Sequence, residues 1–410
     1  MNNIRTRIAF GEKIIAFSFF LFALSCLVSI SFTQIAFTMG ALAWFYVVFL
    51  KNSWEDIQFP MGIAFSLFTL ASILSILFSI NPSKSLHFLK KLVQIFIFFM
   101  FLNNLKGPDQ IRRLLYVIFI AAGLTGLYAC FQSFEYGLSL STRAEGTMSV
   151  YVTFGALMMV NALMVLSFLF FEFNLKKNWW LVPVLIVNLT GLALSLTRST
   201  WVGFLLGLSI LIFLKNKRLF MIVPVLLAVA VMAFPGQVGH RFKSIFDPTD
   251  PTRISRIDMW KMGIKVFKDY PLTGTGYYTL SEVFENYRVK AKQKKVGGLH
   301  SNFFQIITDA GILGITTWIF IWATFFFRCG LIYKSIGDSD PFFRSVVIGS
   351  ISCVAAFLAT GMFEGNFYDS EVIMAIYFLM SLPFVLSLKN LGFIPGTGGK
   401  RLAVAMGKNY

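Results

Sequence analysis

The chain has 410 residues, of which 57% are hydrophobic and only 13% are charged, and its mean hydropathy is +0.72. Soluble proteins average about 45–50% apolar and about 25% charged residues, so this composition excludes a soluble, a nucleic-acid-binding and a disordered protein. In a membrane protein, much of the formal charge of +17 is expected to come from cytoplasmic Lys and Arg, which fix the topology.

A membrane-spanning helix needs about 20 mostly apolar residues. Applied along the chain, this length predicts an all-α polytopic membrane protein with about twelve spans, of which the eighth and ninth are short. The predicted spans cover residues 14–31, 33–50, 61–80, 87–103, 111–133, 151–171, 179–196, 200–214, 219–234, 301–328, 343–361 and 371–388. The basic start also fits a cleaved signal peptide, but the many later spans favour a first membrane helix.

The distribution of Lys and Arg predicts the orientation of these helices. With the N-terminus inside, the short inner segments hold 19 of the 36 basic residues, the short outer segments hold five, and the other 12 lie in residues 235–299. Cytoplasmic short loops are enriched in Lys and Arg, so we expect both termini inside. The predicted organisation is nine helices in 1–234, a periplasmic loop in 235–299, three helices in 300–390 and a cytoplasmic tail in 391–410.

The long loop 235–299 predicts two amphipathic helices on the outer membrane surface. Asp250-Pro251-Thr252 is typical of a helix start, and Tyr270-Pro271 and Gly274-Thr275-Gly276 end that helix. Between them, apolar residues follow on one face at roughly helical spacing: Ile254, Ile257, Trp260, Ile264 and Phe267. A second, more polar helix is expected over roughly 279–293.

The long loop carries 12 basic and six acidic residues. Attraction to anionic lipid headgroups explains its Lys cluster at 290–295 as well as a specific ligand does. Arg253 and Arg256 differ from this cluster, because a cation in the first turn of a helix opposes the helix dipole. We therefore expect an anion to bind at these two arginines.

Arg198 lies between two apolar stretches at the outer ends of two spans. An Arg at the membrane centre costs about 2.5–3.5 kcal/mol, and less near the edge. It is either an interfacial Arg that snorkels to water or a guanidinium fork for a phosphate at the membrane edge. Arg143, beside Gly146 in another short outer loop, is a similar case.

Three His residues are present, and His87 and His240 have ordinary surroundings in the sequence. His300 starts the tenth span, where the helix N-terminus and nearby Arg disfavour imidazolium, so we expect a neutral ring. A neutral imidazole can act as a general base, and an interfacial hydrogen-bonding role is the alternative.

Several acidic residues are candidate partners of His300. Asp309 shares a helix face with Asn302 and Gln305 and is not the expected partner. Glu364, Asp369 and Glu371 in the last outer loop remain open.

Other chemical motifs are absent from the sequence. The four Cys residues lie in or beside apolar runs without a CxxC pattern, and no metal-ligand spacing, P-loop or GxSxG is found. We therefore expect neither a metal nor a cofactor, and the candidate chemistry is a transfer that depends on Arg and His.

Between residues 142 and 314 the sequence resembles the bacterial O-antigen ligase family, part of a superfamily that includes O-antigen polymerases. The resemblance rests on the order and spacing of these motifs: Arg143-Ala144-Glu145-Gly146, Thr197-Arg198-Ser199-Thr200-Trp201, Arg256 with Trp260, Pro271-Leu272-Thr273-Gly274-Thr275-Gly276, and His300-Ser301-Asn302 with Gly311 and Gly314.

The resemblance implies a metal-independent glycosyltransferase with a fold like the GT-C class, in the bacterial inner membrane. It would transfer a glycan from undecaprenyl diphosphate to a sugar hydroxyl of lipid A–core on the periplasmic face. His300 would be the catalytic base, and Arg143, Arg198, Arg253 and Arg256 would bind the diphosphate. The alternatives are a polymerase that uses the same donor and a secondary transporter of an anionic solute, while a membrane scaffold gives no reason for Arg198 or His300.

Overall fold

The structure, a computed structural model, describes residues 2–172, 174–218, 236–244, 247–289, 297–336 and 340–392. Within these ranges it consists of α-helices and short 3-10 helices, without a β-strand.

The helices before residue 219 are α1 (Asn2–Ser25), α2 (Ile30–Lys51), η1 (Trp54–Asp56), α3 (Gly62–Leu77), α4 (Pro82–Ser85), η2 (Leu86–Phe88), α5 (Leu89–Gln94), α6 (Phe96–Asn104), α7 (Pro108–Tyr136), α8 (Tyr151–Phe171), α9 (Leu175–Asn178), α10 (Leu181–Leu194) and α11 (Arg198–Lys215). Those after residue 235 are α13 (Gly236–Lys243), α14 (Pro251–Asp269), α15 (Leu280–Tyr287), α16 (Asn302–Ile336), α17 (Pro341–Gly361) and α18 (Ser370–Leu391).

The helices agree with the predicted membrane spans. Over the described ranges, nine helices are long and apolar enough to cross a membrane, counting Pro82–Asn104 as one, and α3 and α10 are shorter apolar helices. Together they coincide with all the predicted spans except the ninth, at 219–234, which lies outside the described residues. The all-α polytopic class is therefore confirmed.

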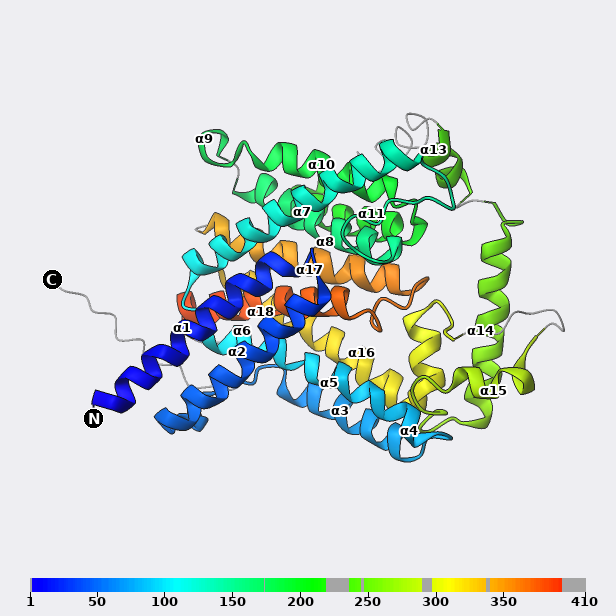
Figure 1. Cartoon of the computed structure of the whole chain (residues 1–410), viewed down its shortest axis with the longest axis horizontal. Helices are drawn as coiled ribbons and strands as arrows, with labels where there is room; N and C mark the ends of the chain where they lie inside the picture. Colours follow the sequence, from blue (N-terminus) through cyan, green and yellow to red (C-terminus); the bar gives the residue numbers. More distant parts are fainter. Residues whose placement is uncertain are drawn as a thin grey trace.

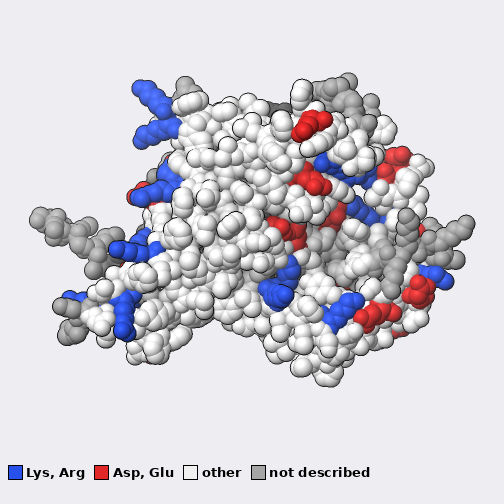
Figure 2. Space-filling view, viewed as in Figure 1, with Lys and Arg blue, Asp and Glu red and all other residues white. Residues whose placement is uncertain are grey.

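The long helices lie side by side in a bundle, and α13, α14 and α15 lie at the end opposite to the start of α1 (Figure 1). We call this end the site end. The face in Figure 2 has Lys and Arg at the other end, a broad uncharged zone, and charges of both signs toward the site end. Such a zone is what a hydrocarbon layer requires of the surface that faces it.

The centre of the bundle is formed by α8, α17 and α18, whose side chains are buried on nearly every side. Helix α11 packs closely on α17 because Gly203 lacks a side chain: a Cβ there would lie 2.3 Å from Thr360 Oγ1 and 2.6 Å from Ala356 O. This approach brings the start of α11 beside the loop that follows α17.

Helix α16 is broken at Gly311, which has φ 60° and ψ −157°, a backbone conformation restricted to glycine. The segment 271–276 pairs with the break. Thr275 N donates to Thr308 O (3.0 Å), Gly276 N to Asp309 O (2.9 Å), and Ile312 N to Pro271 O (2.8 Å). These bonds fix the end of α14 against the bundle.

Helix α14 begins and ends where the sequence predicts, with Asp250 as its N-cap and Tyr270 after its last residue. Of the predicted apolar face, Ile254, Ile257 and Ile264 are 41%, 37% and 45% exposed. The side that packs on the protein carries Met259, Met262 and Val266, which contact α15 and Leu299. The placement of the apolar face on the membrane surface stays a prediction.

The second loop helix is shorter than predicted. Helix α15 ends at Tyr287, because Arg288 has extended backbone angles, and residues 290–293 of the predicted helix lie outside the described residues. A short helix that the sequence did not predict, α13, precedes α14.

We expect Gly311→Ala to lower the stability of the protein by roughly 1–3 kcal/mol or more, because alanine disfavours this conformation and its Cβ would lie 2.3 Å from Leu272 O. Gly330→Ala, in the same helix with nothing within 4 Å of the added Cβ, is the matched control and should be neutral or stabilising. The apparent melting temperature in detergent measures both changes, and equal melting of the two variants would contradict this account.

Candidate functional site

Arg198 is the first residue of α11 and lies at the site end of the bundle. The turn from α10 is made by Leu196, which has a positive φ of 48°. Arg198 Nη1 donates to Ser244 O (2.8 Å) and Ser244 Oγ (3.2 Å), and Nη2 donates to Asp250 Oδ1 (3.0 Å). The guanidinium is therefore held in one orientation by the segment between α13 and α14.

Asp250 connects two parts of the site, the start of α11 and the start of α14. Its carboxylate also accepts from Arg253 N (3.0 Å) and so caps α14. Burial alone would raise the pKa of Asp250, but the hydrogen bonds from Arg198 and from Arg253 N hold it below its ordinary value. The carboxylate is therefore charged at neutral pH and fixes α14 relative to α11.

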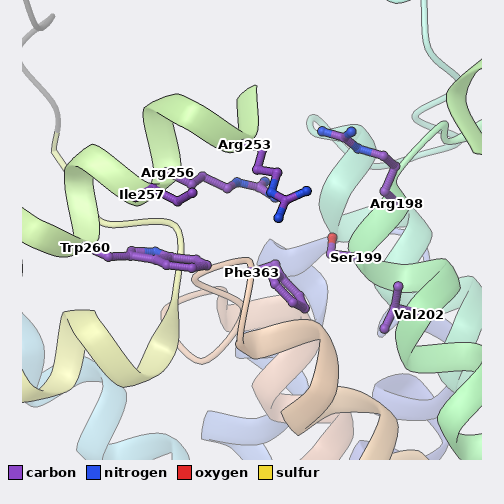
Figure 3. Close-up of a pocket in the computed structure, with 8 residues that line it drawn as sticks. All are labelled: Arg198, Ser199, Val202, Arg253, Arg256, Ile257, Trp260 and Phe363. Carbon is purple, nitrogen blue, oxygen red and sulfur yellow. The ribbon is translucent and has the colours of Figure 1, made fainter. Parts of the chain in front are cut away.

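Arg253 and Arg256 extend from the first turns of α14 toward α11, and their guanidinium groups lie close together above Trp260 and Phe363 (Figure 3). Arg256 Nη2 donates a short hydrogen bond to Glu364 Oε1. Ser199 Oγ lies 3.4 Å from the same oxygen. The arginines of α14 and the start of α11 thus face one another across a shared space.

His300 lies just before α16, in the left-handed backbone region with φ 46°. Its ring Nδ1 is 3.4 Å from Glu364 Oε2, while its side chain is 55% exposed. Of the three acidic residues left open by the sequence, Glu364 is therefore the partner.

The other candidates have partners of their own. Asp369 caps α18 and accepts a short bond from Thr153 Oγ1. Asp309 accepts from Gln305 Nε2 and Tyr368 Oη at 2.8 Å each, in agreement with the expectation that it does not orient His300.

Arg143 lies with its guanidinium 4.2 Å from the centre of the Tyr151 ring, and its Nε donates to Leu140 O (3.1 Å). A fifth arginine, Arg241 of α13, was not singled out by the sequence. Burial lowers the pKa of Arg241 to about 10, helped by the like charges of Arg198 and Arg143. Arg241 is therefore partly buried and lies beside like charges.

Two cavities meet at Arg198, Ser199 and Arg256. The apolar cavity, of about 390 Å³, is also lined by Val202, Arg253, Ile257, Trp260 and Phe363 (Figure 3). The polar cavity, of about 280 Å³, is also lined by Arg143, Tyr151, Val152, Thr197, Arg241, Thr252, Ser255, Met259, His300 and Glu364. All five residues predicted for the site therefore line one or both cavities.

The charges of this site do not balance. Five guanidinium groups line the two cavities, and the carboxylates in contact with them over the described ranges are Asp250 and Glu364. Without counting His300, this leaves three excess positive charges, which favours a ligand with several negative charges. Among the described residues no group of three or more His, Cys, Asp and Glu side chains is arranged to hold a metal ion.

Comparison with known proteins gives one family. Residues 183–319 match the family model described as O-antigen ligase, and this segment includes Arg198, Arg253, Arg256 and His300. A search of curated proteins gave no match to the chain.

We expect inorganic pyrophosphate to bind this site and to raise the melting temperature of the purified protein. Arg198→Gln and Arg256→Gln should each weaken that binding by roughly 10–100-fold, because a hydrogen bond to a charged group contributes about 1.5–3 kcal/mol. Arg288→Gln is the matched control, since Arg288 is paired with Glu285 on an exposed part of the chain and lines neither cavity. Equal pyrophosphate affinity in all three variants would contradict an anion site here.

Proposed function

Because residues 183–319 match the family model described as O-antigen ligase, we propose that the chain belongs to this family and is a membrane glycosyltransferase of lipopolysaccharide biosynthesis. It transfers a polysaccharide from undecaprenyl diphosphate to a sugar hydroxyl of lipid A–core. The observation that carries the proposal is the convergence of four arginines and His300 on one polar cavity that shares a wall with an apolar one.

The donor fits the two cavities by its chemistry. Its polyprenyl chain is apolar, its diphosphate is anionic, and its glycan is polar. In the proposed complex the chain enters the apolar cavity beside Val202 and Phe363, the diphosphate lies at Arg198 and Arg256, and the first sugar extends into the polar cavity. The acceptor hydroxyl then approaches from the side of His300.

The proposed reaction moves charge toward the arginines. The acceptor oxygen bonds to the anomeric carbon, the bond from that carbon to the diphosphate oxygen breaks, and the electron pair goes to the diphosphate. His300 takes the proton of the acceptor hydroxyl. The diphosphate carries about two negative charges before the transfer and about three after it. Fixed guanidinium groups therefore stabilise the leaving group more strongly than the bound donor, which is the requirement for catalysis.

The proposed location is the bacterial inner membrane, with the site end facing the periplasm and a fold like the GT-C class. Its support is the excess of Lys and Arg in the short segments at the opposite end, which in a bacterial inner membrane face the cytoplasm.

His300→Gln should reduce the turnover number by about 10²–10⁴-fold, since a general base contributes that much, and should leave pyrophosphate binding within a factor of about three of the wild-type value. His87→Gln is the control, because His87 bonds to Lys84 O and lines neither cavity. The assay follows transfer of glycan to lipid A–core by purified protein in EDTA. Full transfer by His300→Gln would remove the base assigned here.

A polymerase that uses the same donor is the second candidate, since the family match does not distinguish the two activities. A ligase should produce capped lipid A–core of the same glycan length as the donor. A polymerase should lengthen the lipid-linked glycan and leave the core uncapped. Absence of both products, with wild-type pyrophosphate binding, would favour transport of an anionic solute over either transfer reaction.

A further inference from the structure

Glu364 lies in the loop between α17 and α18, with its side chain only 10% exposed, and its two oxygens serve different partners. Oε1 accepts the short bond from Arg256 Nη2. Oε2 faces His300 Nδ1 at 3.4 Å. One buried carboxylate therefore connects an arginine of the anion site with the only histidine that lines the described parts of the two cavities.

The loop that carries Glu364 is tied to the start of α16. Asn302 Nδ2 donates to Asn366 Oδ1 (2.6 Å), and Phe367 N donates to Asn302 Oδ1 (3.1 Å). Asn366 Nδ2 in turn donates to Phe357 O (2.9 Å). Since His300 is two residues before Asn302, the carboxylate and the ring have little freedom to move apart.

The contact with Glu364 selects the tautomer of the His300 ring that a general base needs. A carboxylate at Nδ1 holds the proton on that nitrogen and leaves the lone pair on Nε2. For Nε2 the described residues offer no hydrogen-bond partner, and the ring lines the polar cavity. His300 can therefore present Nε2 to an acceptor hydroxyl while Glu364 orients it from behind.

The same carboxylate competes with any anion for Arg256. In the structure, Arg256 is bonded to Glu364. A diphosphate that binds the guanidinium draws it away from Oε1, and the carboxylate can then bond more closely to Nδ1. The 3.4 Å separation between Oε2 and Nδ1 leaves room for that tightening.

We propose that Glu364 is a positioning residue that couples the two substrates: it is displaced from Arg256 by the donor diphosphate and then orients His300 toward the acceptor. This inference rests on the proposed function for the identity of the donor and the acceptor. The competition for Arg256, however, concerns any diphosphate and can be measured without a transfer reaction.

The test is Glu364→Gln, which keeps the shape of the side chain and removes its charge. We expect the turnover number to fall by about 10–100-fold, part of the effect of a general base. We expect pyrophosphate to bind about 3–10-fold more tightly, because Arg256 is released from an ion pair. A merely structural role would weaken activity and binding together. Glu285→Gln, the same change at an exposed position of α15, is the control and should alter neither turnover nor pyrophosphate binding.

Each outcome bears on the inference separately from the proposed function. Transfer by the wild-type protein with unchanged turnover in Glu364→Gln overturns the coupling and leaves the function intact. Equal or weaker pyrophosphate binding in Glu364→Gln, with unchanged melting, overturns the competition. If Glu364→Gln melts at a much lower temperature, Glu364→Asp replaces it: it keeps the charge, so partial recovery of turnover supports the inference and no recovery overturns it.

Discussion

The burial of guanidinium groups beside one another is the constraint on which this end of the molecule depends. For Arg241 burial carries the larger cost, and the like charges of Arg198 and Arg143 add to it. Backbone carbonyls offset part of that cost: Leu140 O, Ser244 O and Leu196 O accept from Arg143, Arg198 and Arg241. Carbonyls bring no negative charge, so the site keeps a net attraction for anions that full pairing with carboxylates would have cancelled.

Holding like charges together requires a rigid frame, and short local features provide it. Asp250 both caps α14 and pairs with Arg198 of α11, so one side chain fixes two helices. At the other end of α14, segment 271–276 bonds into the break in α16 at Gly311. Because both ends of α14 are fixed, Arg253 and Arg256 keep their positions even though Ile254, Ile257 and Ile264 of the same helix are exposed.

The sequence predicted the features that depend on residues adjacent in the chain, such as membrane spans and helix ends. Long apolar runs located the described spans, and the Asp250-Pro251 start and the Tyr270-Pro271 end located α14, because capping and chain-breaking are local. The face of α14 that packs on the protein was not predicted, since an apolar stripe at helical spacing can face lipid, ligand or protein. Only the tertiary contacts distinguish these, and here Met259, Met262 and Val266 hold the protein side.

The residues of the candidate site also divide into those that the local sequence predicts and those that only the fold reveals. Arg198, Arg253, Arg256 and His300 stood out because cations at helix starts and a lone histidine at a span boundary are unusual locally. Arg241 did not, since it was one of 12 basic residues in a long loop and its crowding is visible only in three dimensions. Glu364 was one of three acidic candidates, and its selection depends on a contact across 64 residues of chain.

The two cavities lie in the same order as the parts of an amphipathic, lipid-linked donor. An amphipathic donor consists of an apolar chain, an anionic linkage and a polar glycan, in that order, and the reacting bond lies between the last two. The protein repeats the same order in space: an apolar cavity with Val202 and Phe363, a shared wall with Arg198 and Arg256, and a polar cavity with His300. A solute small enough to be carried through the bundle has no need of this sequence of surfaces, whereas a lipid-linked glycan that reacts at its first sugar needs all three.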